Sequence, residues 1–277
     1  MKTSVLGVFL FCGCVLGFTQ KHLLTSKTIP LLSDVKPLPE LPKENKVSWW
    51  QPKFGLTFHI QHIKNKEEAR KLPHVDVINL ELSHVQKYLG PNFFKSTDKK
   101  LVCYFSASFE DWRSDADLYP KDAMGHAMAE WNESWGNIYK RSLRDFLENR
   151  MDLAQSLGCD AIEIDNTDPA FNAQEAGFNI TPKQNKEALI DLAGRSHKRN
   201  MAIFLKNTGD LAAELEPHFD GVFNEQCGQY NECDDFEAFV KAGKPVFQVE
   251  YHTCKPFEGH VVHRKAGYFE VDYTVCK

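Results

Sequence analysis

Residues 161–166 read AIEIDN, an aliphatic segment that ends in acidic and amide side chains. Because side chains alternate along a strand, Glu163 and Asp165 fall on one face, opposite Ile162 and Ile164. Two carboxylates on one face of such a strand are costly to bury unless they are paired or used in chemistry. The segment therefore predicts a buried strand with a functional site at its carboxyl end.

Seven further segments are also short and mainly apolar. Most are near-continuous apolar runs, which are typical of a parallel sheet covered on both faces. Helical patterns separate several of them, which indicates an α/β fold with right-handed crossovers. Eight strands favour a closed, single-domain (β/α)8 TIM-like barrel. An open doubly wound sheet is the alternative, but neither GxGxxG nor GxxxxGK(S/T) follows a strand. The eight expected strands are Phe54–Gln61, Val75–Leu82, Lys100–Ser108, Ala161–Asn166, Met201–Asn207, Gly221–Cys227, Pro245–Tyr251 and Gly267–Val275. The expected helices are Glu67–Leu72, Ser134–Leu157, one that opens at Thr181 and Pro182, and Asp235–Ala242.

The N-terminus has the build of a secretory signal peptide, which we place at residues 1–17: Lys2, an apolar run over Val5–Leu16, then a small residue. Residues 18–48 are rich in proline and lysine, and we expect a leader that does not build the core. Residues 49–277 are left for the barrel. We therefore expect a secreted, extracellular protein.

Charge and hydropathy limit the partners. The formal net charge is −5, from 33 basic and 38 acidic residues, and no Lys/Arg run exceeds two residues. This balance argues against a nucleic-acid partner. Past the N-terminus no stretch approaches the ~18 apolar residues of a membrane span, so we expect no membrane partner. The sequons at Asn132 and Asn179 fit secretion as expected glycosylation sites.

Six cysteines follow the predicted signal peptide, an even number that suggests disulfides in a secreted chain. Sequence alone does not fix their pairing. Cys103 and Cys159 lie in strand-like segments, where we expect buried thiols. The cysteines that we expect to form disulfides are Cys227, Cys233, Cys254 and Cys276.

Polar side chains also end the neighbouring strands, with Lys206, Asn224, Glu225 and Glu250 at three of them. Barrels of this class build their active site at the carboxyl ends of the strands. Convergent carboxylates suit glycoside hydrolysis, in which one acid protonates the leaving oxygen and the other attacks or activates water. The alternative is that these acids are solvated rim residues or helix N-caps. Trp112 lies in a loop after the third strand and is a candidate for stacking on a sugar.

A series of motifs then resembles glycoside hydrolase family 114, the endo-α-1,4-polygalactosaminidases, over about residues 49–251. The resemblance implies a TIM-like barrel with Asp165 and Glu225 as the catalytic acids, whereas the strand pattern alone does not separate Asp165 from Glu163. It implies Asp165 as nucleophile or stabilising carboxylate and Glu225 as proton donor, with reversed roles as the alternative. The motifs are Cys103-Tyr104-Phe105-Ser106-Ala107, Glu110-Asp111-Trp112-Arg113, Gly158-Cys159-Asp160, Asp165-Asn166-x-Asp168, Leu205-Lys206-Asn207 and Asn224-Glu225-Gln226-Cys227-x-x-Tyr230-Asn231-Glu232-Cys233. The residues expected to bind substrate are Asn79, Tyr104, Ser106, Trp112, Glu163, Asn166, Asp168, Lys206, Asn224 and Glu250.

Three positions depart from the family's pattern. Asn79 stands where an aspartate is common, Glu163 where a shorter acid is common, and Trp135-Gly136-Asn137-Ile138 where a Trp-Leu-Asp-Ile run is usual. We expect Trp135 to pack as part of its predicted helix. The changes at positions 79 and 137 each remove a negative charge, which favours subsites for acetylated or neutral sugars.

We therefore expect a secreted, monomeric glycosidase that cleaves internal α-1,4 bonds of a galactosamine-containing polysaccharide without a cofactor or metal. One alternative is a carbohydrate-binding relative of the same fold that lacks turnover. The other is a metal-dependent barrel hydrolase with Ca²⁺ or Mg²⁺ on Asp160, Glu163, Asp165 and Asp168.

Overall fold

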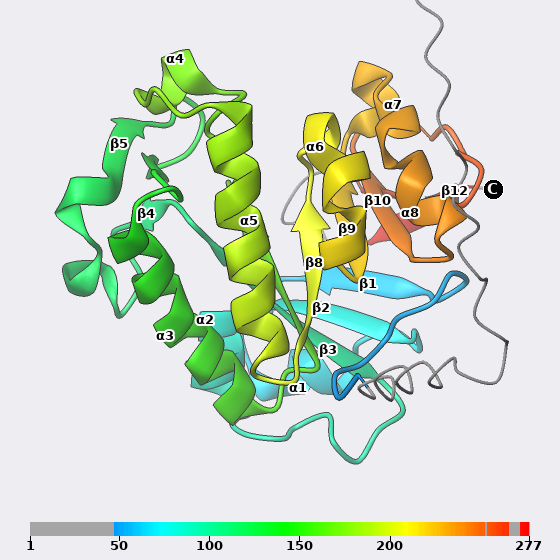
Figure 1. Cartoon of the computed structure of the whole chain (residues 1–277). Helices are drawn as coiled ribbons and strands as arrows, with labels where there is room; N and C mark the ends of the chain where they lie inside the picture. The colour runs from blue at the N-terminus through cyan, green and yellow to red at the C-terminus, as the bar shows by residue number, and fades with distance from the viewer. Residues whose placement is uncertain (1–46, 253, 266–271, 277) are drawn as a thin grey trace, which may run out of the picture. The chain divides into compact units, whose positions relative to one another are not determined.

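The computed structural model, which describes residues 47–252, 254–265 and 272–276, is built around a curled sheet of nine strands (Figure 1). Eight neighbouring strands are parallel, and the ninth pairs antiparallel with the eighth. The fold is the expected TIM-like α/β barrel. In spatial order the strands are β1 (Phe58–Gln61), β2 (Val77–Glu81), β3 (Lys100–Ser106), β7 (Ala161–Asp165), β8 (Ala202–Lys206), β9 (Gly221–Glu225), β10 (Val246–Glu250), β11 (His260–Lys265) and β12 (Tyr273–Cys276).

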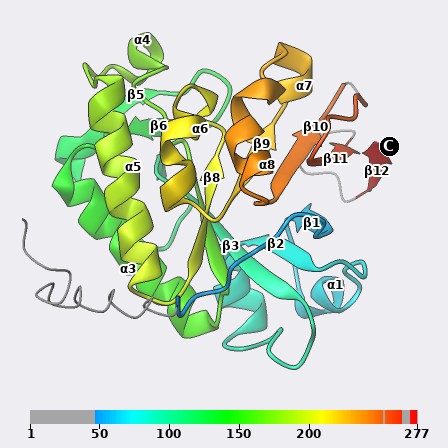
Figure 2. The ribbon, with the colours of Figure 1, turned by 45° about the vertical axis from the view of Figure 1, so that its right-hand side comes forward.

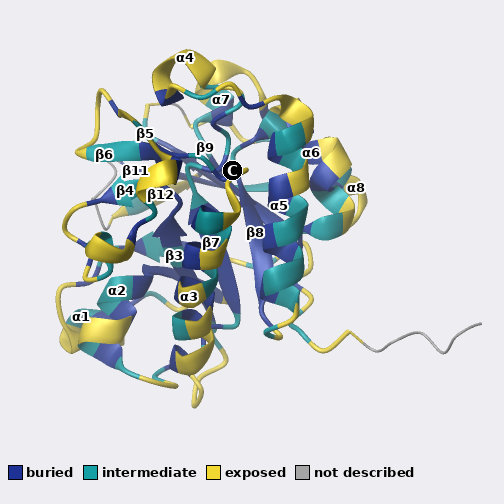
Figure 3. Cartoon of the chain, turned by 60° about the vertical axis from the view of Figure 1, so that its left-hand side comes forward, coloured by how far each residue is buried: buried dark blue, intermediate teal, exposed yellow. Residues whose placement is uncertain are grey.

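Helices cover the outside of this sheet, and α5, α6 and α8 lie side by side on it (Figure 2). The longest are α3 and α5, each with one buried face (Figure 3). A capping box between Thr181 and Gln184, with Pro182 at the first turn, fixes the expected start of α5. The helices are α1 (Lys66–Arg70), α2 (Leu82–His84), the π-helix η2 (Val85–Leu89), α3 (Arg141–Leu157), α4 (Ala173–Ala176), α5 (Pro182–His197), α6 (Gly209–Leu215), α7 (Cys227–Tyr230) and α8 (Glu237–Lys241). Short 3-10 turns are η3 (Ala116–Leu118), η4 (Lys121–Ala123), η5 (Glu216–His218) and η6 (Cys233–Phe236).

The inside of the barrel is apolar at one end and polar at the other. The apolar end holds four phenylalanine rings together with smaller apolar side chains of the strands. The rings are those of Phe58, Phe204, Phe223 and Phe247. Phe58 on β1 also stacks on His263 of β11, with ring centroids 4.1 Å apart, so the first and eighth strands lie close together. Because side chains alternate, the later inward positions of β2, β7, β8 and β9 carry the polar groups of the site.

A second, three-stranded antiparallel sheet lies between β3 and α3 in the chain, formed by β4 (Phe109–Glu110), β6 (Glu133–Gly136) and β5 (Met124–Ala127) in that order. The expected helix Ser134–Leu157 is therefore wrong in its first part, and Trp135 is buried in a strand rather than in a helix. Gly136 lies so close to the carbonyl oxygen of Ala107 that any side chain there would clash. That close approach keeps residue 136 in the sheet.

The eighth barrel strand is also not where the sequence placed it. It is β11, whereas the expected segment Gly267–Val275 lies partly in residues 266–271, outside the described residues, and otherwise in antiparallel β12. The segment His260–Lys265 reads HVVHRK, and its four polar residues hide the apolar pattern of a barrel strand.

Three disulfides are present. Cys227–Cys233 and Cys254–Cys276 confirm the expected cysteines, but Cys103 and Cys159 form a third bridge instead of remaining thiols. The reason is spatial: Cys103 lies on β3, and α3 returns the chain so that Cys159 stands just before the adjacent strand β7.

The described barrel residues belong to one unit, Val47–Lys277. The predicted signal peptide, and the predicted leader up to residue 46, lie outside the described residues. Within the described part, no helix has the length and apolar character needed to cross a membrane.

Candidate active site

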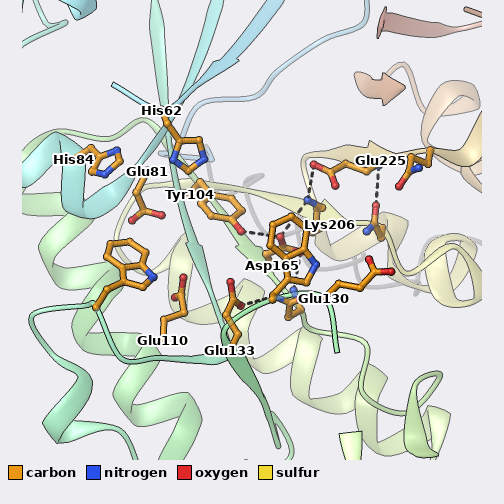
Figure 4. A pocket seen from close by; sticks show the side chains of 15 residues that line it. His62, Glu81, His84, Tyr104, Glu110, Glu130, Glu133, Asp165, Lys206 and Glu225 are labelled. Atoms are coloured by element: carbon orange, nitrogen blue, oxygen red, sulfur yellow. Dashed lines mark hydrogen bonds and ion pairs between the residues drawn. The ribbon is translucent and has the colours of Figure 1, made fainter. Parts of the chain in front are cut away.

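A cavity of about 520 Å³ opens at the carboxyl ends of the parallel strands. This is the end at which barrels of this class place their active sites, and the volume suits a small-molecule or sugar site. Figure 4 shows its side chains. The lining residues are His62, Glu81, His84, Tyr104, Glu110, Trp112, Glu130, Trp131, Glu133, Asp165, Asn166, Lys206, Asn207, Glu225 and Gln226.

Asp165 and Glu225, the two expected catalytic acids, both contact Lys206 on the floor of this cavity (Figure 4). They end β7 and β9, and Lys206 ends β8, which lies between those strands. Lys206 Nζ is 3.3 Å from Asp165 Oδ2 and 3.4 Å from Glu225 Oε1. The buried ammonium therefore offsets the repulsion between two carboxylates that share one site.

Asp165 is held by donors on several sides. The Tyr104 hydroxyl donates to Oδ2 over 2.8 Å, and the backbone N–H of Asn166 donates to Oδ1 over 2.8 Å. Parallel pairing of β3 with β7 brings these residues together, because Ser106 is opposite Asp165 and Tyr104 is opposite Glu163. Both oxygens of Asp165 are thus fixed in direction.

The backbone turns sharply after each of the three strands that carry Asp165, Lys206 and Glu225. Asn166, Asn207 and Gln226 follow β7, β8 and β9, and each has a positive φ, of 56°, 49° and 66°. Such conformations cost energy for residues with a side chain and cluster at functional sites. Here they place Asn207 Oδ1 where it accepts a 2.9 Å hydrogen bond from the backbone N–H of Glu225.

Glu163 lies one layer below the catalytic pair. Its side chain is almost fully buried, 3.6 Å from Lys206 Nζ, and it accepts a hydrogen bond from Asn79 on β2. Burial raises the pKa of this carboxyl to about 7, and Lys206 opposes that shift. The acidic strand motif thus contains one carboxylate at the cavity surface and one beneath it.

A buried ion cluster at the edge of the cavity has no counterpart in the sequence-based expectations. Arg113 donates to the two oxygens of Glu81, over 2.7 Å and 3.0 Å, and to Glu110. Glu81 ends β2, where strand alternation from Asn79 places it on the inward face. Strand alternation could therefore have predicted that Glu81 faces the inside of the barrel, but nothing in the sequence predicts its contact with Arg113.

Glu133, on β6, also lines the cavity without having been expected there. It accepts hydrogen bonds from the Ser108 hydroxyl and, over 3.4 Å, from Asn166 Nδ2. Burial raises the pKa of Glu133, and the nearby Asp165 carboxylate adds to the shift. Glu133 directly precedes the segment Ser134–Leu157, which the sequence predicts as a helix, so the sequence contains no sign of a strand that places it beside Asp165.

The expected substrate-binding residues occupy three kinds of position. Those that line the cavity are Tyr104, Trp112, Asn166 and Lys206. Asn79 and Glu163 lie just beneath it, around a smaller cavity of about 20 Å³. Ser106, Asp168, Asn224 and Glu250 do not line the cavity.

Those four residues support the site from outside it. Asn224 and Glu250 hold the start of α7, because they accept hydrogen bonds from the backbone N–H groups of Cys227 and Gly228, over 3.0 Å and 2.7 Å. The Ser106 hydroxyl accepts from Asn166 Nδ2 over 2.8 Å. Burial raises the pKa of Asp168 to about 6, and the Asp165 carboxylate adds to this shift.

Asp160 lies apart from the other acids of its segment. It precedes β7 at the amino-terminal end of the strand, where it bonds to Lys100 Nζ over 2.9 Å and to the backbone N–H of Leu101 over 3.0 Å. Asp165 stands at the opposite, carboxyl-terminal end of the same strand. The acids at 160 and 165 therefore do not share one ion-binding site.

Comparison with known proteins gives a consistent result. The model of glycoside-hydrolase family GH114 matches residues 39–270. Among solved structures, the chain is similar to Aspergillus fumigatus Ega3 in complex with galactosamine, with a TM-score of 0.69 and 28% identity over 82% of this chain and 96% of that one. Its fold also resembles the glycoside hydrolase domain of Pseudomonas aeruginosa PelA, with a TM-score of 0.57 and 15% identity over 75% of this chain and 93% of that one. No curated protein gives a sequence match. Because the family match spans most of its length, the chain belongs to glycoside-hydrolase family GH114 and is a glycosidase.

Proposed function

We propose that this glycosidase is secreted and hydrolyses internal α-1,4 bonds of a galactosamine-containing polysaccharide, with Asp165 and Glu225 as its two catalytic carboxylates. The observation that carries the proposal is the contact of both carboxylates with Lys206 on the floor of one cavity. Hydrolysis of a glycosidic bond needs two such groups on either side of the bond.

Asp165 has the surroundings of a nucleophile, since Tyr104, Asn166 and Lys206 hold its oxygens in place. In the first step a carboxylate oxygen of Asp165 bonds to the anomeric carbon as the carbon–oxygen bond to the leaving sugar breaks. Glu225 gives its proton to that leaving oxygen. In the second step Glu225 takes a proton from water, which attacks the anomeric carbon and releases Asp165.

The spacing of the carboxylates supports this two-step route. Asp165 Oδ2 and Glu225 Oε1 lie 3.3 Å and 3.4 Å from the same Lys206 Nζ, so the two oxygens are separated by at most these two contacts end to end. Retaining enzymes have carboxyl groups about 5–5.5 Å apart, and inverting enzymes about 6.5–9.5 Å apart. The greatest possible separation of the two oxygens is therefore close to the shortest separation in inverting enzymes. It is reached only if both oxygens and Lys206 Nζ lie on one line, and any smaller angle at Nζ brings the oxygens closer to the retaining separation.

Charge in the cavity supports a cationic amino sugar. Glu130 and Glu133 lie beside the catalytic pair, so carboxylates outnumber the Lys206 ammonium on this side (Figure 4). A concentration of one charge in a cleft raises the local concentration of ligands with the opposite charge. Ega3, which is similar over most of its length, has been crystallised with galactosamine.

Secretion is supported by the three disulfides, because such bonds persist in oxidising compartments. We propose residues 1–17 as the signal peptide and residues 18–48 as a leader, whose last two residues belong to the barrel unit. Asn132 and Asn179 are both exposed, which permits glycosylation at these sequons.

The decisive experiment incubates the secreted protein with partially deacetylated α-1,4-linked polygalactosamine and sizes the products. We expect a rapid fall in polymer length, and Asp165→Asn and Glu225→Gln to lower turnover by orders of magnitude while binding persists. Asp122→Asn, an exposed change at η4, is the matched control. Binding without new reducing ends in the parent protein would make it a carbohydrate-binding relative, and loss of activity in chelator would make it a metal-dependent hydrolase.

A further inference from the structure

The cavity has different electrostatic character on its two sides (Figure 4). Glu130, Asp165 and Glu225 lie on one side, which we call the acidic side. His62 and His84 lie on the other, with the ring of Trp112 next to His84 at a centroid distance of 6.4 Å. We call these three residues the histidine side.

The acids on the histidine side share one cation. Glu81 and Glu110 line the cavity there, both bond to Arg113, and all three side chains are buried. Burial raises the pKa of Glu110 to about 7, against the effect of Arg113, so this carboxyl is partly protonated near neutral pH. The histidine side therefore carries less net negative charge than the acidic side, whose three carboxylates face the single ammonium of Lys206.

The two histidines are neutral there. Burial lowers the pKa of His62 to about 4; Glu81 opposes this shift, whereas His84, Lys265 and Arg113 add to it. Burial also lowers the pKa of His84, which faces Glu81, Arg113 and Lys87. A neutral imidazole offers one donor and one acceptor, which suits hydroxyl and amide groups.

Trp112 completes this side with an apolar surface, since 53% of the residue is exposed. A tryptophan ring commonly attracts a cation, but here the guanidinium of Arg113 already lies 4.5 Å from the ring centroid. A second cation on this ring would meet that like charge at short range. The ring is therefore better suited to the carbon face or the acetyl methyl group of a neutral sugar.

We propose that the histidine side is a subsite for a neutral N-acetylated hexosamine unit, while the acidic side takes a unit with a free ammonium group. The inference rests on the proposed function and refines it. The preferred substrate is then a polymer that contains both acetylated and deacetylated hexosamine units. The enzyme would cut it at a fixed distance from an acetylated unit. A free ammonium on the histidine side would lose hydration and meet only carboxylates that already bond to Arg113.

The test compares two α-1,4-linked galactosamine polymers of equal length, one fully and one half deacetylated, with mass-spectrometric sequencing of the fragments. We expect the half-deacetylated polymer to be cut faster, and an acetylated unit to stand at one fixed position from the new chain ends. Equal rates with acetyl groups at random positions would overturn the inference and leave the proposed function standing. Failure to cut either polymer would overturn both.

Variants at Trp112 test the charge argument at the exposed side chain of the histidine side. Trp112→Glu adds a carboxylate where Arg113 is already shared by Glu81 and Glu110, and we expect it to move the rate ratio toward the fully deacetylated polymer by about two- to fivefold, the effect of one partly exposed ion pair. Trp112→Phe keeps the ring and should keep the ratio. Leu118→Glu adds the same charge at an exposed site outside the cavity lining. If Leu118→Glu shifts the ratio as much as Trp112→Glu, general charge governs the preference and the subsite is refuted.

Discussion

The hydroxyl of Tyr104 on β3 donates a 2.8 Å hydrogen bond to Oδ2 of Asp165 on the neighbouring strand β7. The same oxygen faces Lys206 Nζ, so the phenol and the ammonium share one carboxylate oxygen. This leaves the direction of Asp165 set by three neighbouring strands rather than by a loop. Precise placement of a nucleophile on rigid elements is what a displacement at the anomeric carbon requires.

Tyr104→Phe should therefore impair turnover more than stability. Hydrogen bonds to charged groups contribute roughly 1.5–3 kcal/mol, so we expect kcat to fall about 10- to 100-fold. Tyr119→Phe is the matched control, because that hydroxyl donates to the carbonyl oxygen of Ala107. We expect the control to lower the melting temperature and to keep kcat. Unchanged kcat in Tyr104→Phe would remove this hydrogen bond from the mechanism.

The stereochemical outcome should be retention. The proposed route forms and then breaks a bond to Asp165, and two displacements at the anomeric carbon restore its configuration. Proton NMR of the first products, recorded before mutarotation, should show α-configured reducing ends. Initial β-anomers would mean that Asp165 acts as a base toward water instead.

Glu163 should make stability depend on pH. Its pKa is raised by burial to about 7 in the folded protein from 4.5, so the folded state holds more protons than the unfolded chain between these values. The contribution of Glu163 to the free energy of unfolding therefore falls as the pH rises from 4.5 to about 7. The full contribution is present only below pH 4.5. One pKa unit corresponds to about 1.4 kcal/mol, so the effect is on the order of 3 kcal/mol.

Glu163→Gln removes this titration. Thermal melts of the variant and the parent should therefore diverge between pH 4.5 and pH 7.5, with the variant gaining relative stability at the higher pH. Glu175→Gln, at an exposed site in α4, should show a constant difference. A constant difference for Glu163→Gln as well would mean that the folded state does not hold this proton.

The disulfides should differ in their contribution to stability. The loop closed by Cys103–Cys159 spans 56 residues and that closed by Cys227–Cys233 spans 6. In the chain-entropy picture the longer loop constrains the unfolded chain more, so its removal costs about 1–2 kcal/mol more than removal of the shorter. Urea denaturation of the two double Cys→Ser variants measures this order, and the reverse order would contradict it.

The strands that carry the catalytic groups could be predicted from sequence, because β7, β8 and β9 are apolar runs buried on both faces. Their polar carboxyl ends also pointed to Asp165, Lys206 and Glu225. Alternation along β9 puts Glu225 and Asn224 on opposite faces of the strand. Glu225 lines the cavity, whereas Asn224 accepts a hydrogen bond from the backbone at the start of α7.

Other parts of the site depend on contacts that no local pattern encodes. Arg113 meets Glu81 across 32 positions of the chain, and that pairing arises only when β2 and the loop after β4 come together. Trp135 and Gly136 follow a helical spacing with the residues after them, but close packing against Ala107 holds them in a strand. Tertiary packing overrides the local pattern in both cases.

The small sheet between β3 and α3 gives the cavity a wall of its own. One continuous segment, residues 107–137, contributes Glu110, Trp112, Glu130, Trp131 and Glu133 to the lining, while Asp165, Lys206 and Glu225 come from the barrel strands. Exchange of this single segment would replace a large part of the lining and leave the proposed reaction centre in place. The segment is therefore a compact target for changing substrate preference by design.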